Sequence, residues 1–188
     1  MRLLKNKKAL STVVTTLIIL VVSVLLATVV TFYAINVTTT RVQEELLYLT
    51  KQHVWYSATN TTATGEAAIM VINSGGRDVV IDKITVRGQE CPWTNIHYNV
   101  TRGSEALTGD LEFQSILNNT TQINMGGTIN YTLTQGATTD LTLKSGDTMI
   151  LYIDDPDSIT LNDIGTTVGI TFFTANAQYY KETNVEAA

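Results

Sequence analysis

The sequence predicts an α+β protein in which one long hydrophobic helix precedes an all-β head domain, and three observations support this. Residues 10–35 contain no charged residue, proline or glycine. From residue 54 onward, short runs rich in Val, Ile, Thr and Tyr alternate with clusters of Gly, Asn and Asp, as in strands joined by turns. Only two prolines occur in the chain, so the sequence offers no proline-rich linker between helix and head.

The apolar stretch is longer than a bilayer core requires. At about 1.5 Å per residue, a helix over residues 10–35 spans about 39 Å. Its apolar side chains occupy every face, so the helix must be surrounded by lipid or by other helices. Residues 36–52 then become amphipathic, which predicts that the helix continues to about His53. The expected organisation is a leader over residues 1–9, a helix over 10–53 and a head over 54–188.

Basic residues crowd the N-terminal side of this helix, at Arg2, Lys5, Lys7 and Lys8. Such a flank stays in the cytoplasm, so the head is expected outside the cell. A secretory signal would carry a small-residue cleavage site after its apolar core, but none follows residue 35. The small residue Ala9 precedes the apolar run instead. Cleavage there would remove the basic tip and leave the whole helix on the mature protein.

The string Lys7-Lys8-Ala9-Leu10-Ser11-Thr12-Val13-Val14 resembles the class III signal peptide of archaeal type IV pilins and archaellins. The resemblance implies that a prepilin peptidase cuts between Ala9 and Leu10, with the bond between Lys8 and Ala9 as the alternative. Residues 71–86 also resemble the first hairpin of such head domains. Bacterial type IV pilins carry Glu at the fifth mature position, where this chain has Val14. That departure favours the archaeal branch.

Small and hydroxyl residues recur along the helix at spacings of four and seven, so that they share one side. Such a ridge lets helix backbones approach closely, although Ser and Thr are also tolerated in a single membrane anchor. The residues predicted to pack in a filament core are Thr12, Thr16, Ser23, Ala27 and Thr31.

The head is expected to hold about eight strands in an immunoglobulin-like sandwich of two sheets. A hairpin turn is predicted at residues 73–76, between the first two of the strands listed here. The strand predictions cover residues 66–72, 78–87, 96–101, 111–117, 128–134, 147–153, 166–174 and 178–183.

Composition excludes several classes of function. The formal charge is -5, and removal of residues 1–9 leaves 8 Lys+Arg against 17 Asp+Glu, so nucleic-acid binding is disfavoured. The single cysteine, Cys91, has no intrachain partner, and we interpret it as a buried, inert thiol, with a disulfide between subunits or thiol chemistry as the alternatives. No nucleophile elbow, phosphate loop or dinucleotide fingerprint occurs, so we expect no enzyme activity.

Six Asn-X-Thr sequons make N-linked glycans the one covalent addition that the sequence suggests. Overlap should prevent Asn118 and Asn119 from both carrying a glycan, and unmodified asparagine in a turn is the alternative at every site. The sequons begin at Asn36, Asn60, Asn99, Asn118, Asn119 and Asn130.

No cofactor or metal is expected. Four aspartates, Asp154, Asp155, Asp157 and Asp163, could offer oxygen ligands to Ca²⁺, but they lack the glycine and distant Glu of an EF-hand loop. We therefore expect an ordinary acidic turn. The two histidines, His53 and His97, lie far apart without companion ligands, which makes a zinc site improbable.

The preferred hypothesis is a structural subunit of an extracellular, adhesive archaeal pilus-like filament. The resemblance implies a prepilin peptidase, an assembly ATPase and a polytopic membrane platform as partners, besides further copies of the chain. The precursor would wait in the cytoplasmic membrane. Two alternatives stay open: an archaellin of a rotary swimming filament, and a monomeric surface-binding protein held by an uncleaved anchor. In the last case the aromatic residues of the head could bind sugars.

Overall fold

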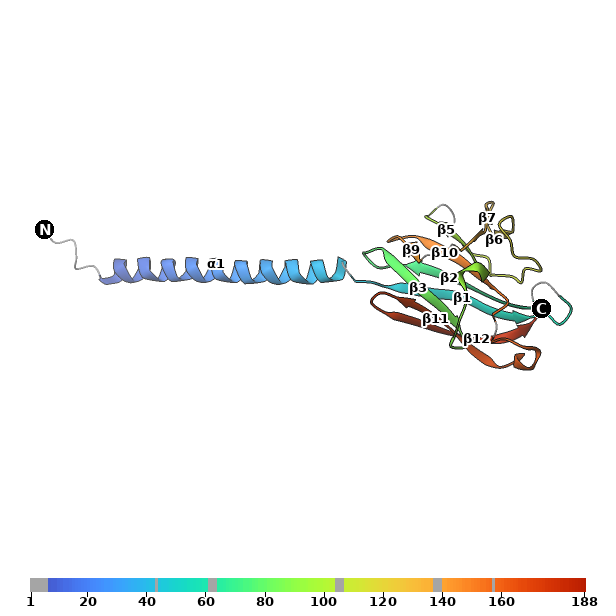
Figure 1. The fold of residues 1–188 in the computed structure, drawn as a ribbon. Helices are drawn as coiled ribbons and strands as arrows, with labels where there is room; N and C mark the ends of the chain where they lie inside the picture. Colours follow the sequence, from blue (N-terminus) through green and yellow to red (C-terminus); the bar gives the residue numbers. More distant parts are fainter. Residues whose placement is uncertain (1–6, 43, 61–63, 104–106, 137–139, 157) are drawn as a thin grey trace. The chain divides into compact units, whose positions relative to one another are not determined.

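A computed structural model of the chain describes residues 7–42, 44–60, 64–103, 107–136, 140–156 and 158–188. The chain forms two compact units, Met1–Gln43 and Glu44–Ala188, which we describe separately (Figure 1). The first contains helix α1 (Lys7–Val42), and the second contains the β-strands of the head.

Helix α1 is continuous over 36 residues. Its many Val, Ile and Thr residues are poor helix formers in water, but in lipid the backbone must satisfy its own hydrogen bonds, which favours a helix. Within the described residues, Leu10–Thr40 is the stretch that is long and apolar enough to cross a membrane, and none of it is buried. The predicted hydrophobic helix is therefore confirmed over its apolar part.

The predicted extension of the helix to His53 is wrong, because α1 ends at Val42 and strand β1 (Leu47–Tyr56) begins soon after. Leu47 and Leu49 are buried while Tyr48 is exposed, so the same residues also fit the two-residue period of a strand. Hydrogen bonding to a strand on each side stabilises that alternative. The head accordingly begins at Glu44 and not at Val54.

The head is built mainly from strands, with two short 3₁₀ helices among the described residues. Beyond β1, the elements are β2 (Gly65–Asn73), β3 (Val79–Val86), β4 (Gln89–Glu90), η1 (Trp93–Asn95), β5 (Ile96–Thr101), β6 (Gln122–Asn124), β7 (Asn130–Thr132), β8 (Thr134–Gln135), β9 (Leu141–Leu143), β10 (Thr148–Asp154), η2 (Leu161–Asp163), β11 (Thr167–Thr174) and β12 (Gln178–Ala187).

Ten strands form one hydrogen-bonded series that folds into two layers. Its order is β4-β3-β11-β12-β1-β2-β10-β5-β8, with β9 also paired to β3. Strands β1, β2, β10, β5 and β8 form the first layer, and β3, β4, β9, β11 and β12 form the second. The parallel pair β1–β12, with Val54 opposite Val185, joins the layers along one edge.

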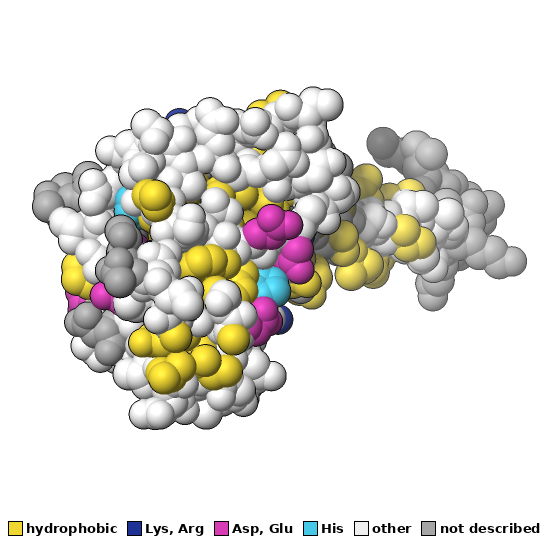
Figure 2. Space-filling view, turned by 90° about the vertical axis from the view of Figure 1, so that its right-hand side faces the viewer, with side chains coloured by type: hydrophobic (Ala, Val, Ile, Leu, Met, Phe, Trp, Pro, Cys, Tyr) yellow, Lys and Arg dark blue, Asp and Glu magenta, His cyan; other side chains and the backbone are white. Residues whose placement is uncertain are grey.

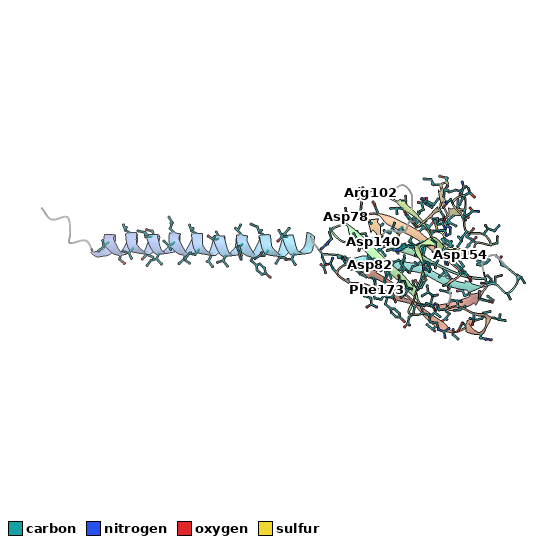
Figure 3. The ribbon with its side chains drawn as sticks, viewed as in Figure 1. Asp78, Asp82, Arg102, Asp140, Asp154 and Phe173 are labelled. Atoms are coloured by element: carbon teal, nitrogen blue, oxygen red, sulfur yellow. The ribbon has the colours of Figure 1, made fainter. Side chains whose placement is uncertain are left out.

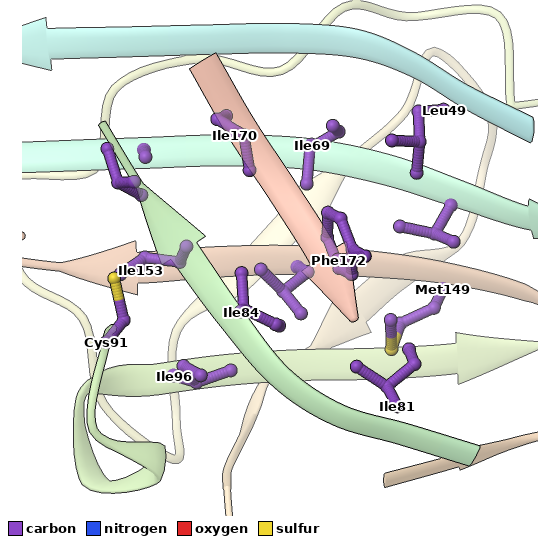
Figure 4. Close-up of a cluster of buried hydrophobic side chains, with 14 of the residues drawn as sticks. Leu49, Ile69, Ile81, Ile84, Cys91, Ile96, Met149, Ile153, Ile170 and Phe172 are labelled. Atoms are coloured by element: carbon purple, nitrogen blue, oxygen red, sulfur yellow. The ribbon is translucent and has the colours of Figure 1, made fainter. Parts of the chain in front are cut away.

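The main core lies between these layers. Ile69 and Met149 come from the first layer, and Ile81 and Phe172 come from the second (Figure 4). All four side chains are fully buried. Cys91 lies at the margin of the same cluster with 6% of its surface exposed. The predicted β-sandwich head is thus confirmed, and its core is apolar.

The turn at residues 73–76 does not form the predicted hairpin. Strand β2 pairs with β1 and β10, whereas β3 pairs with β4, β9 and β11. The turn therefore carries the chain from one layer to the other. Asn73 stabilises the crossing, because its side-chain amide donates to the carbonyls of Arg77 at 2.9 Å and Leu143 at 3.0 Å.

A third layer covers the outer face of the first sheet. We call residues 107–133 the cap. Its apolar side chains pack on β1, β2 and β10 to form a second core of Trp55, Ala68, Met70, Leu111, Ile123, Met125, Tyr131, Leu133, Ile150 and Tyr152. Strand β2 is consequently buried on both faces over most of its length.

The cap explains two inaccurate strand predictions. Residues 111–117 lack strand structure, although Leu111 and Phe113 alternate with polar residues. They lie across the face of a sheet, so their backbone bonds side chains instead of a neighbouring strand: Glu112 accepts from Tyr152 and Gln114 donates to Glu66. The predicted strand 128–134 is divided into β7 and the start of β8.

Candidate functional sites on the helix and the capped face

The surface of α1 is largely apolar on every face, and most of its Ser and Thr hydroxyl groups donate to carbonyls of the same helix. Thr16 donates to the carbonyl of Val13 at 2.9 Å, and Ser23 donates to that of Ile19 at 2.7 Å. Off the predicted ridge, Thr28 donates to Val24 at 2.6 Å in the same way. Such bonds remove the cost of placing hydroxyls in an apolar medium. The helix can therefore reside in lipid or against other helices without polar partners.

The ridge residues are all exposed and follow one side of the helix by their spacing. In this series, Ala27 is the smallest side chain, and its carbonyl accepts the Thr31 hydroxyl at 2.7 Å. A hydroxyl folded back on its own helix projects little, so the ridge leaves room for a second backbone. The packing role of these residues stays a prediction.

The predicted processing residues lie where α1 begins. The helix begins at Lys7, so Lys8, Ala9 and Leu10 fall in its first turn. Leu10 is 70% exposed. The side chains of the three preceding residues lie outside the described part, and cleavage remains a prediction.

Five of the six sequon asparagines belong to the cap or donate a hydrogen bond to it, although they are far apart in sequence. Asn118, Asn119 and Asn130 are exposed residues of the cap itself. Asn60 donates its side-chain amide to the carbonyl of Ser115 at 2.7 Å, and Asn99 donates to Thr132 at 2.7 Å. The sixth, Asn36, lies on the exposed surface of α1. The fold therefore gathers candidate acceptors on the capped side of the head.

The overlapping sequons differ in the bonds that their side chains make. The Asn118 side-chain oxygen accepts from the Thr120 backbone N–H at 2.8 Å and from the Thr120 hydroxyl at 2.6 Å. The side-chain oxygen of Asn119 instead accepts from the backbone N–H of Gln135 at 2.6 Å, which ties the cap to β8. Asn130 accepts from Asn124 within the β6–β7 pair. The side chain of Asn119 thus connects the cap to β8, whereas that of Asn118 stabilises only its own turn.

The aspartates near residue 155 do not converge on one point. Asp163 accepts from the Thr160 hydroxyl at 2.6 Å, from the Thr160 backbone N–H at 2.9 Å and from Arg87 at 2.5 Å, and these bonds lower the pKa of its carboxyl group. Asp155 accepts the Thr64 hydroxyl at 2.5 Å. Asp157 lies outside the described residues. Within the described part of the chain, no three His, Cys, Asp or Glu side chains are placed to hold a metal ion.

The two histidines belong to different parts of the first sheet. His53 stacks on Trp55 with ring centroids 5.1 Å apart, and its Nε2 lies 3.1 Å from Asp110 of the cap. His97 is 5% exposed on β5, and burial lowers its pKa. Figure 2 shows one face of the head on which acidic side chains gather around a histidine, beside separate apolar patches.

The aromatic residues do not form one continuous exposed surface. Trp55 and Tyr131 are buried in the cap core, while Trp93, Tyr98 and Tyr179 pack against the main core. Tyr180 is 57% exposed, and its ring lies over Gly169. Most of this aromatic area therefore stabilises the head.

One polar residue of the head escaped the sequence analysis. Glu66 is completely buried in β2, and burial raises its pKa to about 8. A single carboxylate within the run Gly65-Glu66-Ala67-Ala68-Ile69-Met70-Val71 was the signal that could have found it. Strand β3 of the second layer also has an acidic residue within its apolar run, Asp82, but that side chain is exposed. Figure 3 labels Asp82 and Asp154 at separate places on the head.

Comparison with known proteins gave no match: no protein-family model fits the chain, and no curated protein is similar to it. Function must therefore be argued from the chain itself.

Proposed function

We propose that the protein is a structural subunit of an extracellular type IV pilus-like filament, assembled by bundling of α1 after its basic tip is removed. The observation that carries the proposal is a helix of 36 residues that exposes apolar side chains on every face, joined to a head with two closed cores of its own. A head that buries its own apolar surface does not need this helix for folding. The helix is thus available for lipid first and for sibling helices afterwards.

The basic flank supports the order of events. Lys7 and Lys8 are the first two residues of a helix that is otherwise uncharged up to Arg41, and charged groups are costly in an apolar bundle. Removal of residues 1–9 would leave a uniformly apolar rod. The resemblance to archaeal pilins and archaellins supplies the enzyme class, a prepilin peptidase that cuts between Ala9 and Leu10.

Transfer from lipid to a bundle changes little hydrophobic free energy, because lipid tails and apolar side chains are similar environments. Close packing along the ridge of small residues and contacts between heads would supply the bias. Such contacts join different surfaces of neighbouring copies and therefore propagate as an open helix. The Ser11-Thr12-Val13-Val14 start resembles that of adhesive pilins more than that of archaellins. This resemblance alone favours an adhesive pilus over a rotary filament.

The deciding experiment is electron cryomicroscopy of filaments shed from cells, combined with mass spectrometry of the N-terminus. The expected result is a detergent-free fibre with helices at its centre, built from chains that begin at Leu10. A full-length chain that is found only with membranes, as a monomer in detergent, would instead identify a permanently anchored surface protein.

A further inference from the structure

Glu66 is a carboxyl-bearing residue buried in the middle of a sheet. It is completely buried, and its Oε1 accepts the backbone N–H of Gln114 from the cap at 3.0 Å. Its other oxygen, Oε2, is buried without a hydrogen-bond partner in the described structure. An ionised carboxylate in that position would be strongly destabilising.

Asp154 lies directly opposite Glu66 in the register of β2 and β10. Its Oδ1 is also buried without a partner among the described residues. Side chains opposite each other on one face of an antiparallel pair are neighbours. Each of these two paired residues thus has one buried acceptor oxygen left unsatisfied, and a single proton held between the two carboxyl groups would satisfy both.

The surrounding groups favour retention of that proton. The Tyr152 hydroxyl on β10 donates to the backbone carbonyl of Glu112 in the cap at 3.0 Å, and Tyr152 lies near Glu66. Burial, followed by the negative charge of Asp154, raises the pKa of Glu66. Burial and the negative charge of Asp155 likewise raise the pKa of Asp154.

The cationic groups that face the cap from β1 are engaged elsewhere. Lys51 donates to the carbonyls of Leu107 and Gly109, the former at 2.8 Å. His53 lies between Asp110 at 3.1 Å and Glu186 at 3.5 Å. The neutral ring of Trp55 is the β1 side chain opposite Glu66.

We propose that Glu66 and Asp154 hold one proton between them, and that this shared proton acts as a latch that keeps the cap closed over the first sheet. When the proton leaves to solvent, two carboxylates remain on paired positions of β2 and β10, with Glu66 completely buried and the Asp154 Oδ1 atom buried beside the strand. Opening the cap is the movement that would hydrate them, because Gln114 and Phe113 cover the site from above. Opening would also expose the apolar surface of Trp55, Met70 and Ile150.

The direction of the pH effect follows from the two pKa values of Glu66, about 8 in the closed state and 4.5 when hydrated. The closed state binds the proton more tightly than the open state, so opening becomes easier as pH rises from about 4.5 to about 8 and then levels off. His97 lies on the capped face of β5, opposite Tyr152, and burial lowers its pKa. Protonation of His97 therefore favours opening at low pH, and it opposes the trend from Glu66 only below its ordinary pKa of 6.5. A window from about pH 6.5 to about pH 8.5 therefore isolates the carboxyl pair.

The test is hydrogen–deuterium exchange of the full chain in a non-ionic detergent, followed over the peptides of residues 107–117. After division by the intrinsic exchange rate, opening of the wild-type cap should increase about 25-fold across the window. Glu66→Gln keeps the acceptor for Gln114 and adds a permanent donor toward Asp154, so its change should stay below about twofold. Glu182→Gln, at an exposed carboxylate of β12, should behave as the wild type does.

Asp154→Asn provides a second reading if Glu66→Gln does not fold. Its amide would bond the ionised Glu66 and lower the pKa of that group, so the rise in opening should shift to lower pH and become small within the window. The latch is refuted if the wild-type cap opens equally at both pH values, or if Glu66→Gln keeps the full increase. Neither outcome bears on whether the chain forms filaments, which the N-terminus and the fibres decide.

Discussion

Gly75 occupies the crowded point at which the chain enters the head and crosses between its two layers. Its N–H donates to the carbonyl of Leu46 at 3.1 Å, and its own carbonyl accepts the Ser145 hydroxyl at 2.7 Å. A Cβ atom at this position would lie 2.6 Å from the Glu44 carbonyl oxygen and 2.7 Å from the Leu46 nitrogen. Both are backbone atoms that cannot turn aside, so the sequence has glycine here for space.

We predict that Gly75→Ala destabilises the head by about 1–3 kcal/mol, the usual cost of overpacking. Chemical denaturation of the detergent-solubilised chain, followed by tryptophan fluorescence, measures the change. Gly65→Ala is the matched control, because its Cβ would meet Pro156 and Ile159 at 3.4 Å or more. Equal losses in the two variants would show that close approach at Gly75 is not the cause.

The bonds of Asn118 and Asn119 predict which of the overlapping sequons carries a glycan. Asn118 is exposed and bonded through its oxygen within its own turn, while Asn119 anchors the N–H of Gln135. We expect glycan at Asn118, so Asn118→Gln should remove one glycan mass from the tryptic peptide and Asn119→Gln should not. Glycopeptide mass spectrometry decides. Loss of the glycan only in Asn119→Gln would reverse the assignment.

Among the elements, β1 connects the two halves of the head and also anchors the cap. Its register with β2 shifts between Thr50 and His53, and Lys51 adopts a positive φ of 53° there. This bulge directs the Lys51 ammonium group toward the carbonyls of Leu107 and Gly109. Bulges commonly reorient one side chain in this way.

Lys51→Met should therefore loosen the cap, because it leaves two carbonyls without their charged donor. We expect a loss of about 1–3 kcal/mol, together with faster proteolysis within residues 107–117. Denaturation curves and limited proteolysis measure the two effects. Lys181→Met, on the second layer, tests whether removal of any lysine suffices. If the cap is cleaved equally fast in both variants, the bond from Lys51 is unimportant.

The local hydrophobic pattern of the sequence correctly predicted the strands that are apolar along their whole length. Strands such as β10 and β11 were found because continuous apolar runs of that length, rich in β-branched residues, fit buried strands. Leu47 and Leu49 were assigned to a helix because Leu46, Leu49 and Val42 also satisfy helical spacing, and only pairing with β2 and β12 selects the strand. The cap was missed for a related reason, since residues 111–117 alternate like a strand but pack on a sheet face.

The candidate sites likewise fall into those that local spacing predicts and those that depend on contacts between distant segments. The ridge on α1 could be read from spacing, because a helix keeps residues four and seven apart on one side. The pairing of Glu66 with Asp154 could not, since it depends on the register of two strands and the two residues lie more than eighty positions apart in the sequence. The clustering of sequons on the capped side has the same origin, in contacts such as that of Asn60 with Ser115.

For the whole molecule, charge and apolar surface are divided between the two units. Without residues 1–9, the chain carries 8 Lys+Arg against 17 Asp+Glu, and nearly all of these charges belong to the head. Heads brought together in a fibre would repel one another, increasingly so at low ionic strength. Attraction must then come from the helices, which expose apolar side chains such as Leu25 and Val29 at 60% and 65%.

The ridge of α1 offers the sharpest test of assembly. Ala27→Leu adds bulk at its smallest side chain, which would separate helix backbones without making the span less apolar. We expect filament mass per cell to fall several-fold while processed chain accumulates in the membrane, because membrane residence needs only apolarity. Ala27→Ser keeps the side chain small, and its hydroxyl can bond back to the helix as that of Ser23 does, so its filaments should persist. Normal filaments from Ala27→Leu would mean that helix contacts avoid this side, and loss of the chain from the membrane in both variants would instead point to a failure of insertion.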